Sequence, residues 1–228
     1  MLNLSLPSLN EQAVFSESYS AQTSHFAIPA PKHSLKKRLF DIVIASIAIL
    51  SILIWFIPLV GLLIRLTSPG PVLFVQLRTG RNGRPFRCLK FRTMTYDRNA
   101  EFRQATKNDT RVTRIGQFLR KTNLDELPQV FNVLLGTMSI VGPRPHPIQL
   151  DAQHWHTLPL YPSRYAVKPG ITGLAQVRGH RGETARLIDM EHRVRLDRLY
   201  IQKRTLLLDM RICWWTFTSM VKGDKKAF

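Results

Sequence analysis

The sequence predicts a single mixed α/β domain, rich in helices, that carries one membrane-inserted segment. Three observations lead to this prediction. The chain has 228 residues, which suffices for one domain of ordinary size but not for two. Residues 42–64 contain no charged side chain, and the rest of the chain alternates short strand-like runs with helical patterns. Hydrophobic residues make up 44% of the chain, so it can bury a sizeable core.

The charge of the chain is strongly positive and unevenly distributed. The formal net charge is +18, yet the first 31 residues contain Glu11 and Glu17 and no Lys or Arg. We expect residues 1–33 to form a flexible N-terminal tail, because they are polar and show no sustained periodicity. The basic remainder favours an anionic partner, such as nucleic acid, lipid headgroups or a phosphorylated substrate. Two cysteines are too few for a disulfide framework.

The uncharged run is the membrane candidate, and we assign residues 34–66 to it. As a straight helix its 23 residues would reach roughly 35 Å, enough to cross a hydrocarbon core of about 30 Å. Pro58 predicts a kink or a break inside the run. Basic residues flank both ends, which favours a helix that enters, breaks and returns to the same side. A single span and a buried helix of a soluble protein remain the alternatives.

Residues 67–228 are expected to form the rest of the domain. Residues 72–76 and 85–91 alternate like strands and predict a hairpin with one apolar face and Arg87 on the other. Residues 111–121 predict a helix. The mostly helical pattern of residues 185–221 interleaves basic side chains with aliphatic ones and ends in tryptophans. This pattern fits an interfacial amphipathic helix, and a helix packed on the core fits it equally well.

Two adjacent carboxylates, Asp125 and Glu126, precede an apolar run that ends at Gly136. If Asp125 is the N-cap, Pro128 falls at the third helical position, where no intrahelical bond is lost. Adjacent carboxylates repel one another, so a shared divalent cation is attractive. Ordinary capping at the start of a helix is the alternative interpretation. Arg38 and Asp41 are three residues apart, a spacing that predicts an ion pair between them.

The segment Gly142-Pro143-Arg144-Pro145 presents one arginine between two prolines. Such a stiff, extended backbone suits a guanidinium that binds phosphate oxygens, whereas a surface loop with an idle arginine is the alternative. The basic, glycine-rich loop 178–183 can also approach phosphates. The histidines show no compelling metal spacing, so we expect them to be solvated or hydrogen-bonded.

Together, several ordered motifs resemble the bacterial sugar transferase family, the monotopic polyprenyl-phosphate phosphoglycosyl transferases. The matching strings are KRLFD (37–41), SPGPVLF (68–74), KFRTM (90–94), TRIGQFLRKTNLDELPQ (113–129), GPRP (142–145), KPGITGLAQV (168–177) and RGET (181–184). The resemblance covers about residues 34–222. The RGET string is similar to the subgroup of undecaprenyl-phosphate glucose phosphotransferases, and the chain resembles the minimal catalytic form of the family.

The resemblance implies a role for several residues. Asp125 would be the nucleophile on a UDP-sugar, and Glu126 would assist it and help to bind Mg²⁺, so both would be metal ligands. Arg120, Arg144 and Arg181 would hold phosphate oxygens, although the spacing around His180 leaves the alignment of Arg181 open. Two positions depart from the family pattern. Ile57 replaces the Ser of the usual Ser-Pro break, and Thr137 replaces an Asp after Gly136.

The function that the resemblance implies is transfer of a sugar 1-phosphate from a UDP-sugar to undecaprenyl phosphate, with release of UMP through a covalent aspartyl intermediate. It would start the assembly of exopolysaccharide or O-antigen. The enzyme would insert a re-entrant helix-break-helix into the bacterial inner membrane and contact its lipids, with the catalytic domain on the cytoplasmic face. A non-enzymatic basic module for membrane surfaces or nucleic acid is the alternative. No aromatic-basic recognition motif is present, so nucleic acid is not expected. The sequence predicts no oligomeric state.

Overall fold

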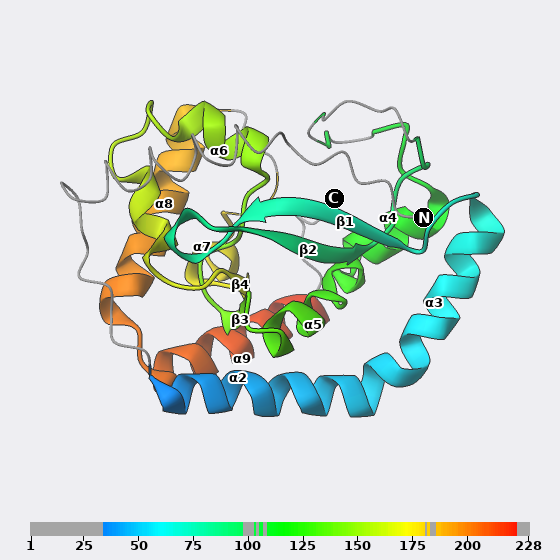
Figure 1. The fold of residues 1–228 in the computed structure, drawn as a ribbon, viewed down its shortest axis with the longest axis horizontal. Helices are drawn as coiled ribbons and strands as arrows, with labels where there is room; N and C mark the ends of the chain where they lie inside the picture. The colour runs from blue at the N-terminus through cyan, green and yellow to red at the C-terminus, as the bar shows by residue number, and fades with distance from the viewer. Residues whose placement is uncertain are drawn as a thin grey trace.

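The computed structural model describes residues 34–97, 103, 105–106, 109–180, 182 and 186–222 (Figure 1). The predicted tail, residues 1–33, and Arg181 therefore lie outside the described residues. The elements, in chain order, are α2 (Leu35–Ala48), η1 (Ile49–Leu53), α3 (Ile54–Thr67), β1 (Leu73–Thr79), η2 (Arg81–Gly83), β2 (Pro85–Phe91), α4 (Arg114–Lys121), η3 (Leu124–Glu126), α5 (Gln129–Leu134), β3 (Ser139–Val141), α6 (Ile148–His154), η4 (Tyr161–Ala166), β4 (Gly170–Thr172), α7 (Leu174–Val177), α8 (Leu187–Lys203) and α9 (Leu206–Lys222). The mixed, helix-rich α/β prediction is confirmed.

A bent helical arm of α2, η1 and α3 runs along one side of the domain (Figure 1). The bend contains the π-helical turn η1, where the amide of Ile54 donates to the carbonyl of Ile49. Pro58 lies inside α3, so the irregular turn precedes the proline instead of coinciding with it. Proline has no N–H for the carbonyl of Ile54, four residues earlier, and its ring crowds that turn. The loss of this bond explains why the helix changes its hydrogen bonding just before Pro58.

By length and composition, the 33-residue helix Leu35–Thr67 is apolar enough to cross a membrane. Only 22% of its most apolar window is buried, which does not fit the core helix of a soluble protein. Leu50 and Leu66, for example, are 71% and 74% exposed. In a soluble protein these side chains would form a large apolar surface in water, so this surface is suited to a lipid environment.

Polar contacts join the start of the arm to the domain. Arg38 donates through Nη1 and Nη2 to the carbonyl oxygens of Val133 and Leu134 at 2.6 and 2.8 Å. Asp41 is buried and accepts from the amide of Ile140 at 3.1 Å. The predicted pair between Arg38 and Asp41 is wrong, because Asp41 instead pairs with Lys37, one helical turn earlier, at 3.1 Å. Arg38 caps the C-terminal carbonyls of α5, where the regular helical hydrogen bonds end.

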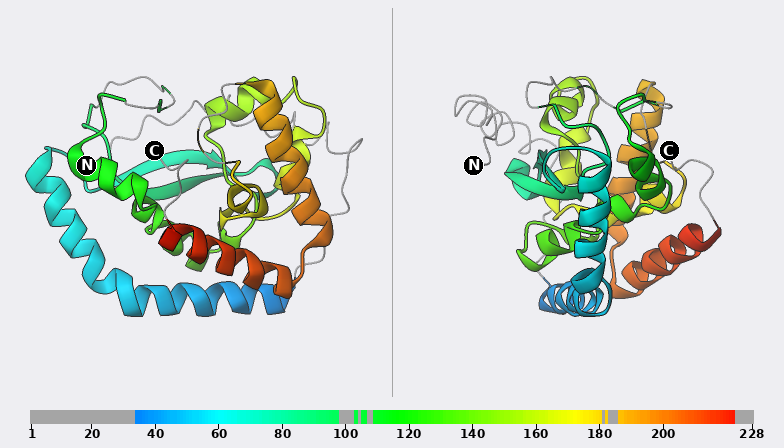
Figure 2. Two further views of the ribbon diagram at one scale, coloured as in Figure 1. Left: turned by 180° about the vertical axis from the view of Figure 1, so that it is seen from behind. Right: turned by 90° about the vertical axis from the view of Figure 1, so that its right-hand side faces the viewer.

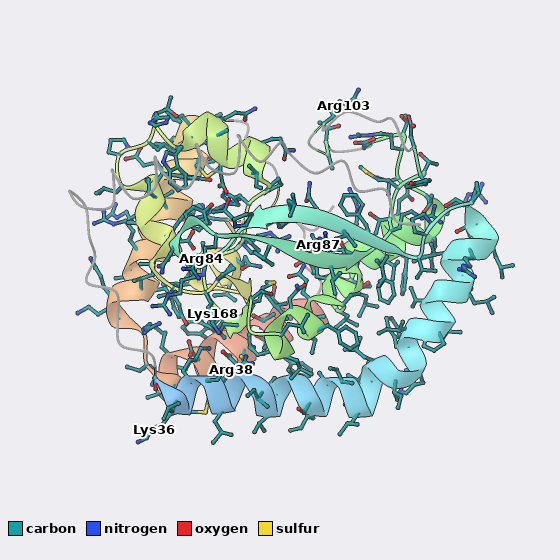
Figure 3. The ribbon with its side chains drawn as sticks, in the orientation of Figure 1. Lys36, Arg38, Arg84, Arg87, Arg103 and Lys168 are labelled. Atoms are coloured by element: carbon teal, nitrogen blue, oxygen red, sulfur yellow. The ribbon has the colours of Figure 1, made fainter. Side chains whose placement is uncertain are left out.

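The first sheet is the predicted hairpin, in which β1 and β2 pair antiparallel with Val75 opposite Leu89. Phe86 and Cys88 point into the core, whereas Arg87 is exposed, as the alternation predicts (Figure 3). The hairpin prediction is therefore confirmed, and β1 extends three residues beyond the predicted strand to Thr79. These extra residues bring Arg78 into the interior.

The second sheet, a parallel pair of β3 and β4, was not predicted. The amide of Gly142 donates to the carbonyl of Thr172 at 2.9 Å, just after the two strands. A Cβ on Gly142 would lie 2.5 Å from the carbonyl oxygen of Lys168, so only glycine permits this approach of the two backbones. Gly170 thus begins a short strand that fixes the start of the Gly142–Pro145 segment.

The helices around the carboxylates differ from the prediction. Helix α4 begins at Arg114, and the Thr113 hydroxyl accepts from the amide of Gly116 at 3.0 Å. Asp125 is not an N-cap, because it lies in the 3₁₀ turn η3, while α5 begins only after Pro128. Asn123 has a positive φ of 57°, so the chain reverses between α4 and this turn. A left-handed residue interrupts helical hydrogen bonding, so α4 ends at Lys121, as predicted, while the Thr113 cap starts it three residues later than predicted.

The C-terminal pattern also forms two helices instead of one. They are α8 and α9, separated at Arg204 and Thr205. Figure 2 shows α9 lying close to α2, and both helices contribute to the main core through Ala45 and Ile212. Helix α9 also has an exposed apolar side, on which Trp214 and Phe217 are 63% and 58% exposed. It therefore combines the two predicted roles, contact with the core on one side and a surface suited to a membrane interface on the other.

Candidate active site

Asp125 and Glu126 lie side by side in the turn η3, between α4 and α5. Their exposed fractions are 9% and 8%, so both acidic groups are largely withdrawn from water. Burial of a carboxylate disfavours its charged form unless cations or hydrogen bonds compensate. The two residues differ in how many cations and hydrogen bonds compensate their charge, and this difference defines the site.

Glu126 is held by two cations from separate parts of the fold. Arg144 forms a bidentate pair with it, in which Nη1 donates to Oε2 at 2.8 Å and Nη2 donates to Oε1. Lys90 of β2 donates to the same Oε1 at 2.5 Å. Burial alone would raise the pKa of Glu126, but Arg144 and Lys90 outweigh it and lower that pKa well below its usual value. Glu126 is therefore a fixed, ionised carboxylate.

Asp125 makes no hydrogen bond or ion pair with any residue in the described part of the chain. Its burial raises its pKa, and the negative charge of Glu126 adds to this effect, whereas Lys90 and Arg144 oppose it. A carboxylate with few hydrogen bonds and a raised pKa is a better nucleophile than one bound by several donors. Asp125 thus has the properties of a reacting group, and Glu126 those of a fixed support.

Arg120 approaches the pair from the last turn of α4. Its Nε donates to Thr93 Oγ1 at 2.8 Å, which leaves the two terminal nitrogens of the guanidinium for other acceptors. Burial lowers the pKa of Arg120, and the charge of Asp125 opposes that shift. The fold therefore brings four of the five predicted site residues together: Arg120, Asp125, Glu126 and Arg144. The fifth, Arg181, lies outside the described residues.

Lys90 is the site residue that the sequence analysis did not assign. It contacts Glu126 directly, and burial lowers its pKa while Glu126 opposes the shift. A signal for it was present in β2, because strand alternation puts Lys90 on the same face as the buried Phe86 and Cys88. A lysine on an otherwise apolar face requires an acidic partner.

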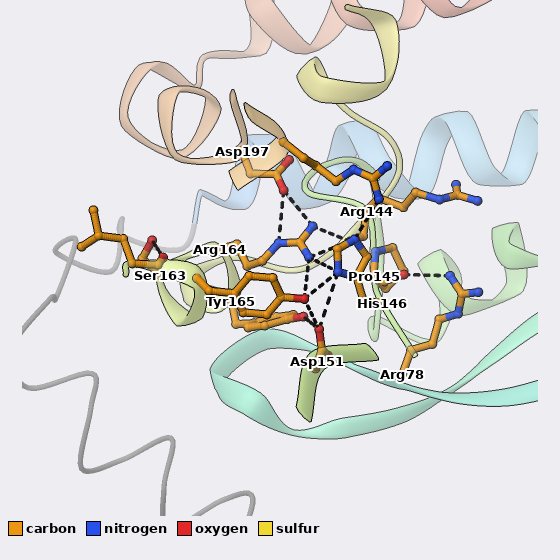
Figure 4. Close-up of polar contacts among 12 residues, drawn as sticks. Arg78, Arg144, Pro145, His146, Asp151, Ser163, Arg164, Tyr165 and Asp197 are labelled. Carbon is orange, nitrogen blue, oxygen red and sulfur yellow. Dashed lines mark hydrogen bonds and ion pairs between the residues drawn. The ribbon is translucent and has the colours of Figure 1, made fainter. Parts of the chain in front are cut away.

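A buried polar network fixes the backbone that carries Arg144 (Figure 4). Nη2 of Arg164 donates to the carbonyl of Arg144 at 2.9 Å and to Asp197 at 2.7 Å. On the other side, Nη1 of Arg78 donates to the carbonyl of Pro145 at 2.7 Å. The interpretation of Arg144 as an idle surface residue is therefore wrong. Its side chain pairs with Glu126. Buried arginines donate to its own carbonyl and to the carbonyl of Pro145.

The same network contains His146, which lies within hydrogen-bonding distance of the Tyr161 hydroxyl at 2.7 Å. Burial and the nearby Arg164 lower the pKa of His146 well below its usual value, so its ring is neutral at pH 7. The prediction of a hydrogen-bonded histidine is confirmed here. Within the described part of the chain, no group of three or more His, Cys, Asp or Glu side chains is arranged to hold a metal ion.

The carboxylates still match the way in which Mg²⁺ is bound to phosphate substrates, through one or two carboxylates together with phosphate oxygens and water. Asp125 has no hydrogen-bond partner among the described residues, so it can supply a ligand directly. Both oxygens of Glu126 already accept from Arg144 or Lys90. Glu126 can therefore ligate a metal only through a remaining lone pair or after one of these contacts loosens.

Comparison with known proteins gives consistent matches. A family model described as "Bacterial sugar transferase" matches residues 32–223. The UDP-glucose:undecaprenyl-phosphate glucose-1-phosphate transferase of Klebsiella pneumoniae is 49% identical over 195 residues, which are 84% of this chain and 41% of that protein. The exopolysaccharide production protein PSS of Rhizobium leguminosarum bv. phaseoli is 47% identical over 194 residues, 83% of this chain and 96% of that protein. The chain thus spans about two fifths of the Klebsiella relative and nearly all of the Rhizobium one.

Proposed function

The chain belongs to the bacterial sugar transferase family, and from this premise we propose that it transfers a sugar 1-phosphate from a UDP-sugar to undecaprenyl phosphate. The activity for which the Klebsiella relative is named supports undecaprenyl phosphate as the acceptor and UDP-glucose as the first donor to test. A relative from Aeromonas hydrophila, 41% identical over 200 residues, is named for transfer of N-acetylgalactosamine phosphate, so other donors belong in the same screen. The product would be the lipid-linked first sugar of an exopolysaccharide or O-antigen.

The observation that carries this proposal is the contrast between the unpartnered Asp125 and the fixed Glu126. In the first step, a carboxylate oxygen of Asp125 attacks the phosphorus that carries the sugar. The bond from this phosphorus to the bridging oxygen breaks, and UMP leaves with that oxygen. In the second step, a phosphate oxygen of undecaprenyl phosphate attacks the same phosphorus, and the acyl phosphate bond breaks. This restores the Asp125 carboxylate and forms the lipid diphosphate sugar.

In this reaction an anion attacks an anionic pyrophosphate, and nearby cations offset the electrostatic repulsion between them. Arg120 and Arg144 lie beside Asp125 and carry guanidiniums suited to phosphate oxygens. Arg144 is oriented by Glu126 and, through its backbone, by Arg164. Mg²⁺ bound by Asp125 and Glu126 together with the pyrophosphate would supply further positive charge. Arg181 remains a predicted phosphate ligand.

The proposal also includes a position in the membrane. We expect the arm to enter the cytoplasmic leaflet of the inner membrane and return, so that Asp125 faces the level of the lipid phosphates. The bend at residues 49–53 and the exposed apolar side chains of the arm support this topology. Cysteines at the exposed positions Ser34 and Thr67 test it with an impermeant thiol reagent. Labelling from the same side of the membrane is expected, and labelling from opposite sides would mean a single span.

The decisive test is UMP release from UDP-glucose by Asp125→Asn, in detergent with Mg²⁺ and undecaprenyl phosphate. We expect a loss of more than about 10³-fold, since the variant lacks the nucleophile. Asp189→Asn is the matched control, because Asp189 pairs with Arg186 on the surface of α8, away from the site. The wild type incubated with donor alone should also gain a sugar phosphate on the 125–126 peptide by mass spectrometry. Full activity in Asp125→Asn would exclude this nucleophile.

A non-enzymatic module that binds anionic lipids or nucleic acid gives different results in the same assays. It would release no UMP, would not depend on Mg²⁺ and would lose binding steeply with salt. Chelation with EDTA followed by Mg²⁺ or Ca²⁺ therefore separates the two functions. We expect EDTA to abolish UMP release and Mg²⁺ to restore it.

A further inference from the structure

A second basic site lies at the opposite end of α5 from Asp125. It is a cavity of about 170 Å³ between the start of α2, the β3–β4 pair and the junction of α8 and α9. The residues that line it are Ser34, Lys37, Arg38, Asp41, Arg81, Ser139, Val141, Ala166, Val167, Lys168, Tyr200 and Arg204. Neither Asp125 nor Glu126 is among them, so the cavity is distinct from the candidate active site.

The lining has a large excess of positive charge, with five Lys or Arg side chains against one carboxylate, Asp41. Lys37 is compensated, because it pairs with Asp41 at 3.1 Å and with Asp209 at 2.9 Å. Among the described residues, the guanidinium of Arg38 donates to backbone carbonyls and pairs with no carboxylate. An anion beside Arg38 would supply negative charge at this guanidinium.

Lys168 is the residue best placed to bind such a ligand. Its ammonium makes no hydrogen bond or ion pair with the described residues. Burial and the charge of Arg38 lower the pKa of Lys168. A Cβ built on Gly136 would lie 3.6 Å from both Lys168 Nζ and Arg38 Nη2, so the two cationic groups lie close together. Asp41 only partly offsets their charge, because it already pairs with Lys37. Figure 3 shows both on the domain side of α2, whereas Lys36 lies on the other side.

Exposed apolar side chains lie close to the lining residues along the chain and indicate where the ligand comes from. Leu35 and Leu39, at the start of α2, are 86% and 63% exposed, and Leu207 and Met210, at the start of α9, are 56% and 50% exposed. Basic groups next to apolar side chains are typical of the level where a protein meets lipid phosphates. A lipid bound here would have its phosphate beside Lys168 and its acyl chains along these helices.

We propose that this cavity binds the phosphate group of a membrane lipid, separately from the reaction at Asp125. The ammonium of Lys168 donates to a phosphate oxygen, and the neighbouring guanidiniums surround the remaining charge. The bound lipid joins α2, α8 and the β3–β4 pair and so holds the arm against the domain. This inference uses the proposed membrane attachment but not the proposed chemistry.

The test is a binding titration of the full chain in dodecyl maltoside with dioctanoyl phosphatidylglycerol, followed by microscale thermophoresis. Dioctanoylglycerol, which lacks the phosphate, is the chain-matched control, and inorganic phosphate tests the free anion. We expect saturable binding of the phospholipid and none of dioctanoylglycerol. Lys168→Ala should weaken it at least about tenfold, as expected for loss of a hydrogen bond between charged groups. Lys168→Arg should retain binding, because the positive charge stays in place.

Lys36→Ala is the matched control, since it removes the same charge one turn from the cavity on an exposed position. We expect it to change the affinity by less than about twofold. Equal losses in the two alanine variants would mean general attraction to a basic surface and would overturn the proposal. Tighter binding of inorganic phosphate than of the lipid would overturn the lipid assignment. Binding by dioctanoylglycerol would show that the acyl chains alone are recognised.

UMP release separates this proposal from the proposed function. Lys168→Ala should keep UMP release from UDP-glucose while it loses the phospholipid, and Asp125→Asn should show the reverse. Loss of both properties in Lys168→Ala, with an unchanged melting temperature, would assign the cavity to the reaction itself and overturn a separate lipid site.

Discussion

The ion pair between Arg144 and Glu126 gives the sharpest expectation from the structure. Arg144→Gln removes both guanidinium contacts to Glu126 and leaves a shorter, uncharged polar side chain. The remaining partner of Glu126 is Lys90, 2.5 Å away. Because Glu126 is 8% exposed, the carboxylate cannot turn to water to replace the lost donors.

The size of the effect follows from burial and from the remaining cation. Breaking a fully buried ion pair costs about 3–5 kcal/mol. The side chain of Arg144 is 27% exposed and Lys90 still compensates Glu126, so we expect the free energy of unfolding to fall by about 2 kcal/mol. Loss of a cationic donor at a reacting phosphate costs a further factor of about 10²–10³ in kcat.

The pH dependence has a definite sign. The pKa of Glu126 is lowered in the folded state, so its pairing stabilises the fold above the usual glutamate value of 4.5, and this contribution is lost as the pH falls through the lowered folded pKa. The stability difference between the wild type and Arg144→Gln should therefore be largest at neutral pH and shrink below pH 4.5.

Kinetics of UMP release and urea unfolding in detergent, both at several pH values, measure these quantities. Arg87→Gln is the control, because Arg87 is exposed on β2 and the substitution removes the same charge. Wild-type kcat in Arg144→Gln would refute the phosphate role of Arg144. A stability difference that persisted unchanged at low pH would refute the pairing with Glu126 as its cause.

Neighbouring residues give three further expectations. Arg164→Ala should raise the KM for the donor, because Arg164 holds the carbonyl of Arg144. Arg164→Lys should recover part of this loss. An unchanged KM in Arg164→Ala would mean a purely structural role for Arg164. Asp125→Asn should raise the melting temperature by about 2–4 °C, since a buried, unpartnered charge is removed, and a lower melting temperature would contradict its isolation. The raised pKa of Asp125 predicts that donor cleavage falls on acidification at a pH above the usual aspartate value of 3.8, which a pH–rate profile of UMP release measures.

The sequence by itself determined the features that depend on local pattern. Strand alternation gave the hairpin of residues 73–79 and 85–91, and the uncharged run gave the long apolar helix. Both patterns depend on residues close together in the sequence, so these elements can be predicted without knowledge of tertiary contacts. The ordered motifs around Asp125 and Arg144 likewise identified the family before any contact was known.

Only the tertiary structure decided how the carboxylates differ. In the sequence Asp125 and Glu126 are adjacent and equivalent, but Lys90, 36 residues before Glu126, and Arg144, 18 residues after it, both bind Glu126 and leave Asp125 unpartnered. The same holds for the left-handed Asn123, which separates α4 from the turn η3, and for the parallel strands β3 and β4. Long-range pairing of charges and strands depends on which segments the folded core brings together. The local periodicity of the sequence does not predict such pairing.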